Sequence, residues 1–151
     1  MKKQIVLIMV ILLLIVLGYC NDTKQNTEYN LYTNKENKKE KQGEIVKFTD
    51  SNLESAIRWE INKLKGYIYK SDLKDITSIY ATYSNIENLS GIEYCTNLTV
   101  LNLNGNKISD ISLLAELKNL KVLDIGHNKI SDISPLSQLT ELKELWITNN
   151  N

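Results

Sequence analysis

Apolar and polar positions repeat along the second half of the chain with a period of 22 residues. The stretch LNLNGNKISDIS at 101–112 returns as LDIGHNKISDIS at 123–134, and each apolar position of the first copy is apolar again in the second. The pattern is present in a less regular form from Ile76, and it begins once more at Leu142. A fixed period of this length predicts a protein built from stacked, similar units.

Each unit has the form L-x-x-L-x-L-x-x-N-x-I-x-x-I-x-x-L-x-x-L-x-x. The two leucines of L-x-L point to the same side of a strand, whereas the later apolar residues, three positions apart, suit a short helical or 3₁₀ return. One unit cannot bury its apolar side alone, so consecutive units must stack. The pattern therefore predicts an α/β solenoid of strands that alternate with short helical returns.

An asparagine follows the strand segment in successive units, at Asn106, Asn128 and Asn150. Its side-chain amide offers two N–H donors and one carbonyl acceptor. If this amide turns inward, it can bond the backbone of its own unit and of the neighbouring unit. We therefore predict a ladder of buried asparagines along the solenoid.

A helical pattern precedes the repeats. Apolar side chains fall on one stripe of a helix, at Leu53, Ala56, Ile57, Ile61 and Leu64. Ser51 and Glu54 have the spacing of a capping box, Gly66 is suited to end the helix, and a second short helical turn is expected from Ser71. Because a solenoid needs an atypical element at its end, this helix is predicted to cap the stack.

The amino-terminal residues have the form of an export signal. Lys2 and Lys3 precede an uninterrupted apolar run of thirteen residues, 5–17. As a helix this run would cover about 20 Å, less than the roughly 30 Å of hydrocarbon that a spanning helix must cross. The segment favours a secretory signal over an ordinary transmembrane helix, and an uncleaved signal anchor stays open.

Cys20 ends the sequence LGYC and resembles the lipid-modified cysteine of bacterial lipoproteins. Tyr19 departs from that motif, because a small residue usually precedes the cysteine. The alternative is ordinary signal cleavage after Cys20, with Gly18 and Cys20 as the small pair of the cleavage site. Each alternative exports the rest of the chain, either anchored to a membrane by lipid or signal, or secreted.

Residues 21–43 are polar and rich in Asn and Lys, so they are predicted to form a disordered tether. The expected organisation is an export segment at 1–20, the tether at 21–43, a helical cap at 44–75 and repeats at 76–151. Within the repeats, 76–97 is degenerate, 98–119 and 120–141 are regular, and 142–151 is partial.

The composition offers few groups for catalysis or metal binding. His127 is the only histidine, which excludes a metal cluster built on imidazoles, and the lone glycines form no phosphate loop. The formal charge is zero, from 18 basic and 18 acidic residues, so nothing steers the whole chain toward nucleic acid. We expect no catalysis, no cofactor and no metal.

Cys95 is interpreted as a buried apolar residue, with a reactive thiol or a disulfide to Cys20 as the alternative.

The middle residue of each L-x-L segment points away from the predicted core. These outward positions and their flanks give the candidate ligand-binding residues, which are Tyr80, Asn102, Asp124, Trp146, Val100, Val122 and Asn104. Tyrosine and tryptophan are enriched at the energetically dominant positions of protein interfaces. A ligand-binding row is one interpretation of the two aromatics, and a chance occurrence among the outward positions is the other.

Taken together, the segments FTDSNLESAIR, SDLKDITSI and the repeats resemble the cap and first repeats of internalin-type leucine-rich repeat proteins of Gram-positive bacteria. The resemblance covers nearly all of 46–151. It implies a right-handed solenoid whose parallel strands line a concave face, and a surface-exposed, non-enzymatic protein that binds another protein, or a glycan, on that face. The alternative is a truncated or amino-terminal fragment of a longer surface protein that acts only as cap and tether.

Overall fold

The computed structural model describes residues 43–151. The predicted export segment, Cys20 and the predicted tether up to residue 42 lie outside the described residues. Within 43–151, no helix is both long enough and apolar enough to cross a membrane. The predicted boundaries of the four regions stay predictions.

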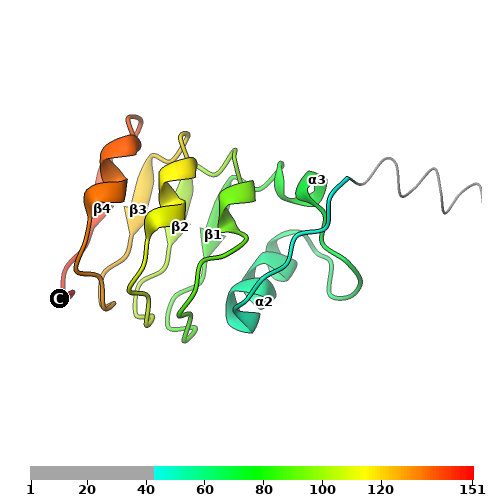
Figure 1. Ribbon diagram of the computed structural model, residues 1–151, viewed down its shortest axis with the longest axis horizontal. Coiled ribbons are helices and arrows are strands. Elements are labelled where there is room, and N and C mark those ends of the chain that lie inside the picture. Colours follow the sequence, from blue (N-terminus) through cyan, green and yellow to red (C-terminus); the bar gives the residue numbers. More distant parts are fainter. Residues whose placement is uncertain (1–42) are drawn as a thin grey trace, which may run out of the picture. The chain divides into compact units, whose positions relative to one another are not determined.

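Within residues 43–151, two helices precede four short strands that alternate with 3₁₀ turns (Figure 1). The strands form one parallel sheet in the order β1-β2-β3-β4, which follows the sequence. This arrangement confirms the predicted α/β solenoid with a helical element at its amino-terminal end. The elements are α2 (Ser51–Glu60), α3 (Lys70–Leu73), β1 (Ser78–Tyr80), η1 (Ile92–Tyr94), β2 (Val100–Asn102), η2 (Ser112–Glu116), β3 (Val122–Asp124), η3 (Ser134–Gln138) and β4 (Glu144–Trp146).

The same backbone hydrogen bond recurs from coil to coil, because each strand pairs with the next in a register of one repeat. The amide of Thr99 donates to the carbonyl of Thr77, that of Lys121 to Thr99 and that of Lys143 to Lys121, each at 2.8 Å. The inward side chains of the middle coils, such as Leu101 and Leu123, are completely buried, whereas Leu145 in β4 is 40% exposed. The core therefore runs along the stack and becomes more exposed at β4.

Cys95 lies in the core of the first coil and has no exposed surface. Burial, aided by the negative charge of Glu93, raises the pKa of its thiol to about 12. The side chain thus behaves as the small apolar residue that the sequence pattern favours, because its reactive thiolate form is disfavoured at neutral pH.

The asparagine ladder is confirmed. The carbonyl oxygen of Asn128 accepts from the amide of Ile108 at 3.0 Å, and its NH₂ group donates to the carbonyls of Leu103 at 3.0 Å and Ile125 at 3.1 Å. Asn150 makes the equivalent contacts with Ile130 and Ile125. Each amide thereby bonds backbone groups in two adjacent coils, with Asn106 and Asn128 buried and Asn150, in the last coil, partly buried.

The predicted start of the cap helix was wrong by one residue. The N-cap is Asp50, whose Oδ1 accepts from the amides of Asn52 at 2.9 Å and Leu53 at 3.1 Å. Ser51 is instead the first helical residue, and Glu54 pairs with Arg58 at 2.7 Å rather than closing a capping box. Asp50 takes this role because its second oxygen also bonds a distant coil, which a local sequence pattern does not reveal.

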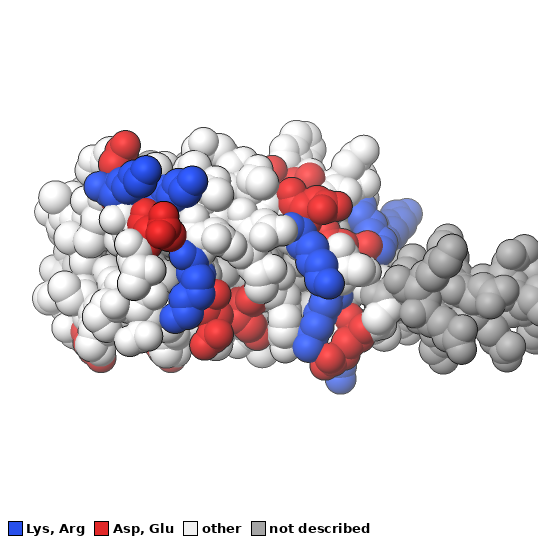
Figure 2. Space-filling view, turned by 90° about the horizontal axis from the view of Figure 1, so that it is seen from above, with Lys and Arg blue, Asp and Glu red and all other residues white. Residues whose placement is uncertain are grey.

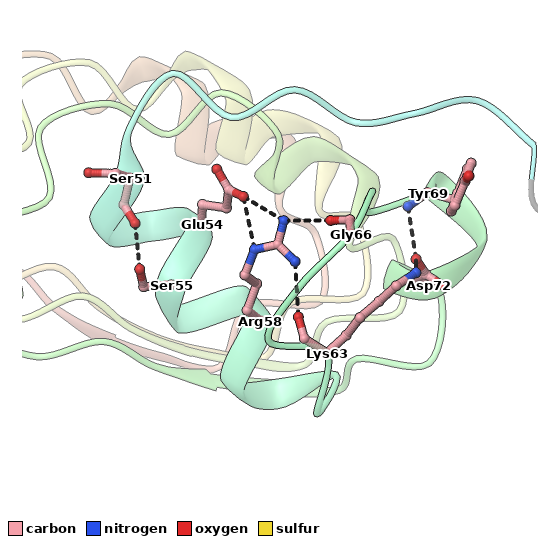
Figure 3. Close-up of polar contacts among 8 residues, drawn as sticks. All are labelled: Ser51, Glu54, Ser55, Arg58, Lys63, Gly66, Tyr69 and Asp72. Carbon is pink, nitrogen blue, oxygen red and sulfur yellow. Dashed lines mark hydrogen bonds and ion pairs between the residues drawn. The ribbon is translucent and has the colours of Figure 1, made fainter.

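The predicted end of this helix was also wrong. Helix α2 stops at Glu60, six residues before Gly66, and Leu64 is 73% exposed rather than on the buried stripe. Arg58 explains the early stop, since its guanidinium donates to the carbonyls of Lys63 at 2.9 Å and Gly66 at 2.8 Å (Figure 3). These bonds fold the following loop back against the helix.

The second predicted helical turn is present as α3, which begins at Lys70, one residue before Ser71. Asp72 fastens its first turn, because Oδ2 accepts from the amide of Tyr69 at 2.9 Å and from Lys63 Nζ at 2.7 Å (Figure 3). Burial raises the pKa of Asp72, but the hydrogen bonds from Lys63 and Tyr69 together lower it by more than burial raises it. The pKa therefore lies below its usual value. The carboxylate therefore stays charged and joins both parts of the cap.

Candidate functional site: the strand face

The outward side chains of the four strands form one surface, which we call the strand face. Strand register places four predicted site residues side by side in a row, in the order Tyr80, Asn102, Asp124 and Trp146. Val100 and Val122 are paired in the adjacent row. The structure thus brings together residues that are separated by whole repeats in the sequence.

The centre of this face is hollowed. A hollow of about 300 Å³ is lined by Tyr80, Val100, Leu101, Asn102, Val122, Asp124 and Trp146. The two aromatic side chains are the more accessible walls, since Tyr80 is 64% exposed and Trp146 is 49% exposed. The valines, Asn102 and Asp124 are partly buried between them. Six of the seven predicted strand-face residues therefore surround a single depression.

The seventh predicted residue, Asn104, fixes the orientation of Asp124. Its NH₂ group donates to Asp124 Oδ1 at 3.0 Å, and the same oxygen accepts from the amide of Gly126 at 3.0 Å. In the preceding coil, Asn102 Oδ1 accepts from the amide of Asn104 at 3.0 Å in the same way. These local turns hold the polar side chains of the hollow in place without help from a ligand.

A second hollow, of about 410 Å³, lies where helix α2 meets β1. Its lining includes Trp59 from the helix, Tyr80 from the strand, and the small polar side chains of Asn52, Ser55 and Ser84. Trp59 is 78% exposed. Trp59 lies outside the apolar stripe that predicts the helix, so it is not among the predicted site residues. A tryptophan off that stripe is the signal that could have found it.

A third hollow, of about 290 Å³, is lined by Glu60, Asp72 and Asp75 together with residues 76–78. Asp72 is already paired with Lys63. Across the described residues 43–151, no group of three or more His, Cys, Asp or Glu side chains is placed to hold a metal ion. His127 is exposed at the exit of β3, where its Nε2 lies 3.0 Å from the side-chain Nδ2 of Asn149.

Charged side chains of both signs are interspersed on the face of the molecule that Figure 2 shows, rather than separated into basic and acidic fields. The strand face differs from this mixture. Among its outward positions from β1 to β4, the charged residues are Asp124 and Glu144, both acidic. A polyanion such as nucleic acid would meet no basic side chain at these positions.

Two sequence families match the repeats. Residues 118–151 match the family described as "Leucine Rich repeats (2 copies)", and residues 94–115 match "Leucine Rich repeat". Strand β2 lies within the match at 94–115, and strands β3 and β4 lie within the match at 118–151. The sequence pattern and the stacked geometry therefore identify the same repeats.

Solved structures of bacterial proteins resemble the chain. An internalin, inlF, from Listeria monocytogenes is 41% identical with a TM-score of 0.66, over 69% of this chain and 31% of that one. InlJ from Listeria monocytogenes, whose functional domain is described as including a cysteine ladder, is 28% identical with a TM-score of 0.65, over 69% of this chain and 23% of that one. The CBM51-2 and INT domains of Clostridium perfringens ZmpB are 28% identical with a TM-score of 0.54, over 60% and 19%. The chain thus spans less than a third of each of these relatives.

Proposed function

We propose that the protein is of the internalin type and that it binds another protein through the strand face, outside a bacterial cell and without catalysing a reaction. The matches to two leucine-rich repeat families and the resemblance to internalins support this proposal. The observation that carries this proposal is the hollow between Tyr80 and Trp146. Its aromatic walls, apolar valines and single charge have the composition of an interface centre, which is rich in aromatic residues and poor in charged ones.

The rigidity of the strand face supports the same proposal. Its backbone is held by the repeated bonds between coils, and its polar side chains are held by local turns and by the bond from Asn104 to Asp124 in the next coil. A surface that is ordered before binding loses less conformational freedom when a partner docks. The second hollow, beside Trp59, shares Tyr80 with the first, and so it extends the proposed binding surface onto the cap.

A photoreactive side chain can test where the partner binds. We would place p-benzoylphenylalanine at Asn102 of the full chain, displayed on the cells that naturally produce it. The matched control carries the same residue at Gln138 on η3, away from the strands. Irradiation should give a protease-sensitive adduct only from position 102. Tyr80→Ala and Trp146→Ala should each reduce its yield about tenfold, as expected for dominant interface residues, whereas Lys118→Ala should not.

Other outcomes of this experiment separate the alternatives. Equal adducts from positions 102 and 138, or an adduct from 138 alone, would contradict binding at the strand face. A partner that resists proteases but is removed by glycosidases would indicate a glycan, which the aromatic walls and the nearby asparagine amides could also accommodate. If neither position gives an adduct when other cells or tissue are present, the result would favour a segment that serves only as cap and tether.

We further propose that the chain is exported and lipid-anchored at Cys20, which rests on the apolar segment 5–17 and the LGYC sequence. The intact mass of the mature protein from membranes of its host tests this directly. The expected mass is that of residues 20–151 plus a diacylglyceryl group. A soluble species that begins at residue 21 would indicate simple secretion without an anchor. A species that retains residue 1 would indicate a signal anchor.

A further inference from the structure

Among residues 43–151, no cation pairs with the carboxylate of Asp124 in the central hollow of the strand face. In the described part of the chain, ion pairs join Arg58 to Glu54, Lys63 to Asp72, Lys70 to Glu44 and Lys107 to Glu87. Neither Asp124 nor Glu144 takes part in one of these. The lysines nearest to them in sequence, Lys121 and Lys143, precede the strands and are not among the residues that line the hollow.

Asp124 is held in a fixed orientation with one oxygen available. Oδ1 accepts from the side chain of Asn104 and from the amide of Gly126, both at 3.0 Å, whereas no described residue donates to Oδ2. A carboxylate oriented before binding does not lose side-chain freedom when a donor arrives. It can therefore accept a charge-assisted hydrogen bond, which is shorter and stronger than a neutral one.

The walls of the hollow favour a cation as well. Tyr80 and Trp146 both line it and both remain about half or more exposed. The face of an aromatic ring attracts an ammonium or guanidinium group, and tryptophan does so most strongly. Val100 and Val122 add an apolar surface, against which the methylene stem of a long cationic side chain can pack.

We propose that this hollow binds a lysine or arginine side chain presented by the partner protein, with Asp124 as the counter-ion and the two aromatic residues as walls. The inference rests on the proposed function, because it names the chemistry of the partner at the same face. Glu144 in β4 pairs with Val122 of the adjacent strand and adds a second negative charge beside the hollow. The partner's docking segment is accordingly basic.

A pair of short peptides isolates the charge. Acetyl-Gly-Gly-Arg-Gly-Gly-amide and the same peptide with citrulline in place of arginine have nearly the same shape, but only the first is cationic. The readout is ¹⁹F NMR of the purified full chain, labelled with 5-fluorotryptophan, which gives separate signals for Trp59 and Trp146. We expect the arginine peptide to shift the Trp146 signal at concentrations about tenfold below those needed for the citrulline peptide.

Asp124→Asn is the decisive variant, because its amide oxygen can still accept from Gly126 and Asn104. It should weaken arginine-peptide binding about tenfold and remove the preference over citrulline, whereas Glu116→Gln, at an exposed position of η2, should change neither. Equal binding of both peptides, or an unchanged preference in Asp124→Asn, would overturn the inference. If the photo-crosslink from position 102 survives in Asp124→Asn at full yield, the strand face binds its partner by neutral contacts, and only the inference about charge fails.

Discussion

Asn106→Ala is expected to lower the free energy of unfolding by about 3–5 kcal/mol, because it leaves several buried backbone groups without partners. Asn106 is only 7% exposed. Its Oδ1 accepts from the amides of Ser84 at 3.1 Å and Ile86 at 2.9 Å, and its Nδ2 donates to the carbonyls of Ala81 at 2.7 Å and Leu103 at 2.8 Å. Alanine removes these four contacts at once, together with a longer one of 3.5 Å to the carbonyl of Asn104.

The size of this effect is large compared with the total stability of a domain, which is typically about 5–15 kcal/mol. Urea denaturation of the full chain, followed by circular dichroism, measures it. Asn97→Ala is the matched control, since its exposed amide makes one bond, to the carbonyl of Lys74 at 2.8 Å, and its loss should cost about 1 kcal/mol or less. A loss below about 1 kcal/mol for Asn106→Ala would mean that water replaces the amide and that the ladder is not a main source of stability.

Asp50→Ala is expected to lower the free energy of unfolding by about 2–3 kcal/mol, because one carboxylate performs two tasks. Oδ1 caps helix α2, and Oδ2 accepts from the amides of Glu87 at 2.7 Å and Asn88 at 3.2 Å in the first coil. Asp50→Asn keeps the capping oxygen but loses the second acceptor, so its cost should be about half as large. Asp75→Ala, at an exposed position of the cap, should stay close to the wild type in the same urea measurement.

The contribution of Asp50 should depend on pH. Burial raises its pKa, but hydrogen bonds from the amides of Glu87, Leu53, Asn88 and Asn52 outweigh burial, so the pKa lies below the usual value of 3.8. A carboxyl group whose pKa is lower in the folded than in the unfolded state stabilises the fold above the unfolded pKa. This stabilisation is lost as the pH falls below 3.8 and through the folded pKa. The stability difference between wild type and Asp50→Asn should therefore shrink in this acid range, and a constant difference would contradict the assigned role.

The solenoid could be predicted from the sequence because each repeat is subject to the same physical constraint and therefore has the same pattern of residues. Each repeat must bury its leucines and satisfy its turn, so the apolar positions and Asn106, Asn128 and Asn150 recur at one spacing. Strand register then follows, since stacked units of equal length place equivalent residues side by side. The row from Tyr80 to Trp146 was predictable for the same reason, although its hollow depends on side-chain packing.

The cap could not be predicted as well, because it occurs once and its details depend on distant residues. Asp50 and Ser51 are both acceptable N-cap residues, and the contact of Asp50 with Glu87 and Asn88 decides between them. Likewise, Arg58 ends α2 early by bonding the loop that follows. The hollow beside Trp59 arises only when α2 packs against β1, so no pattern within either segment reveals it.

The repeated bonds between adjacent coils have a consequence for evolution. Because the amide of Lys121 meets Thr99 as that of Lys143 meets Lys121, the junction between two coils is the same wherever it occurs. Duplication of a gene segment that encodes 22 residues would therefore insert one coil without altering the contacts on either side, and the identity of eight of the twelve residues between 101–112 and 123–134 is consistent with such an event. Each duplication would widen the strand face by one strand, leaving point mutation free to change the outward residues and so to diversify the partners that we propose for this face.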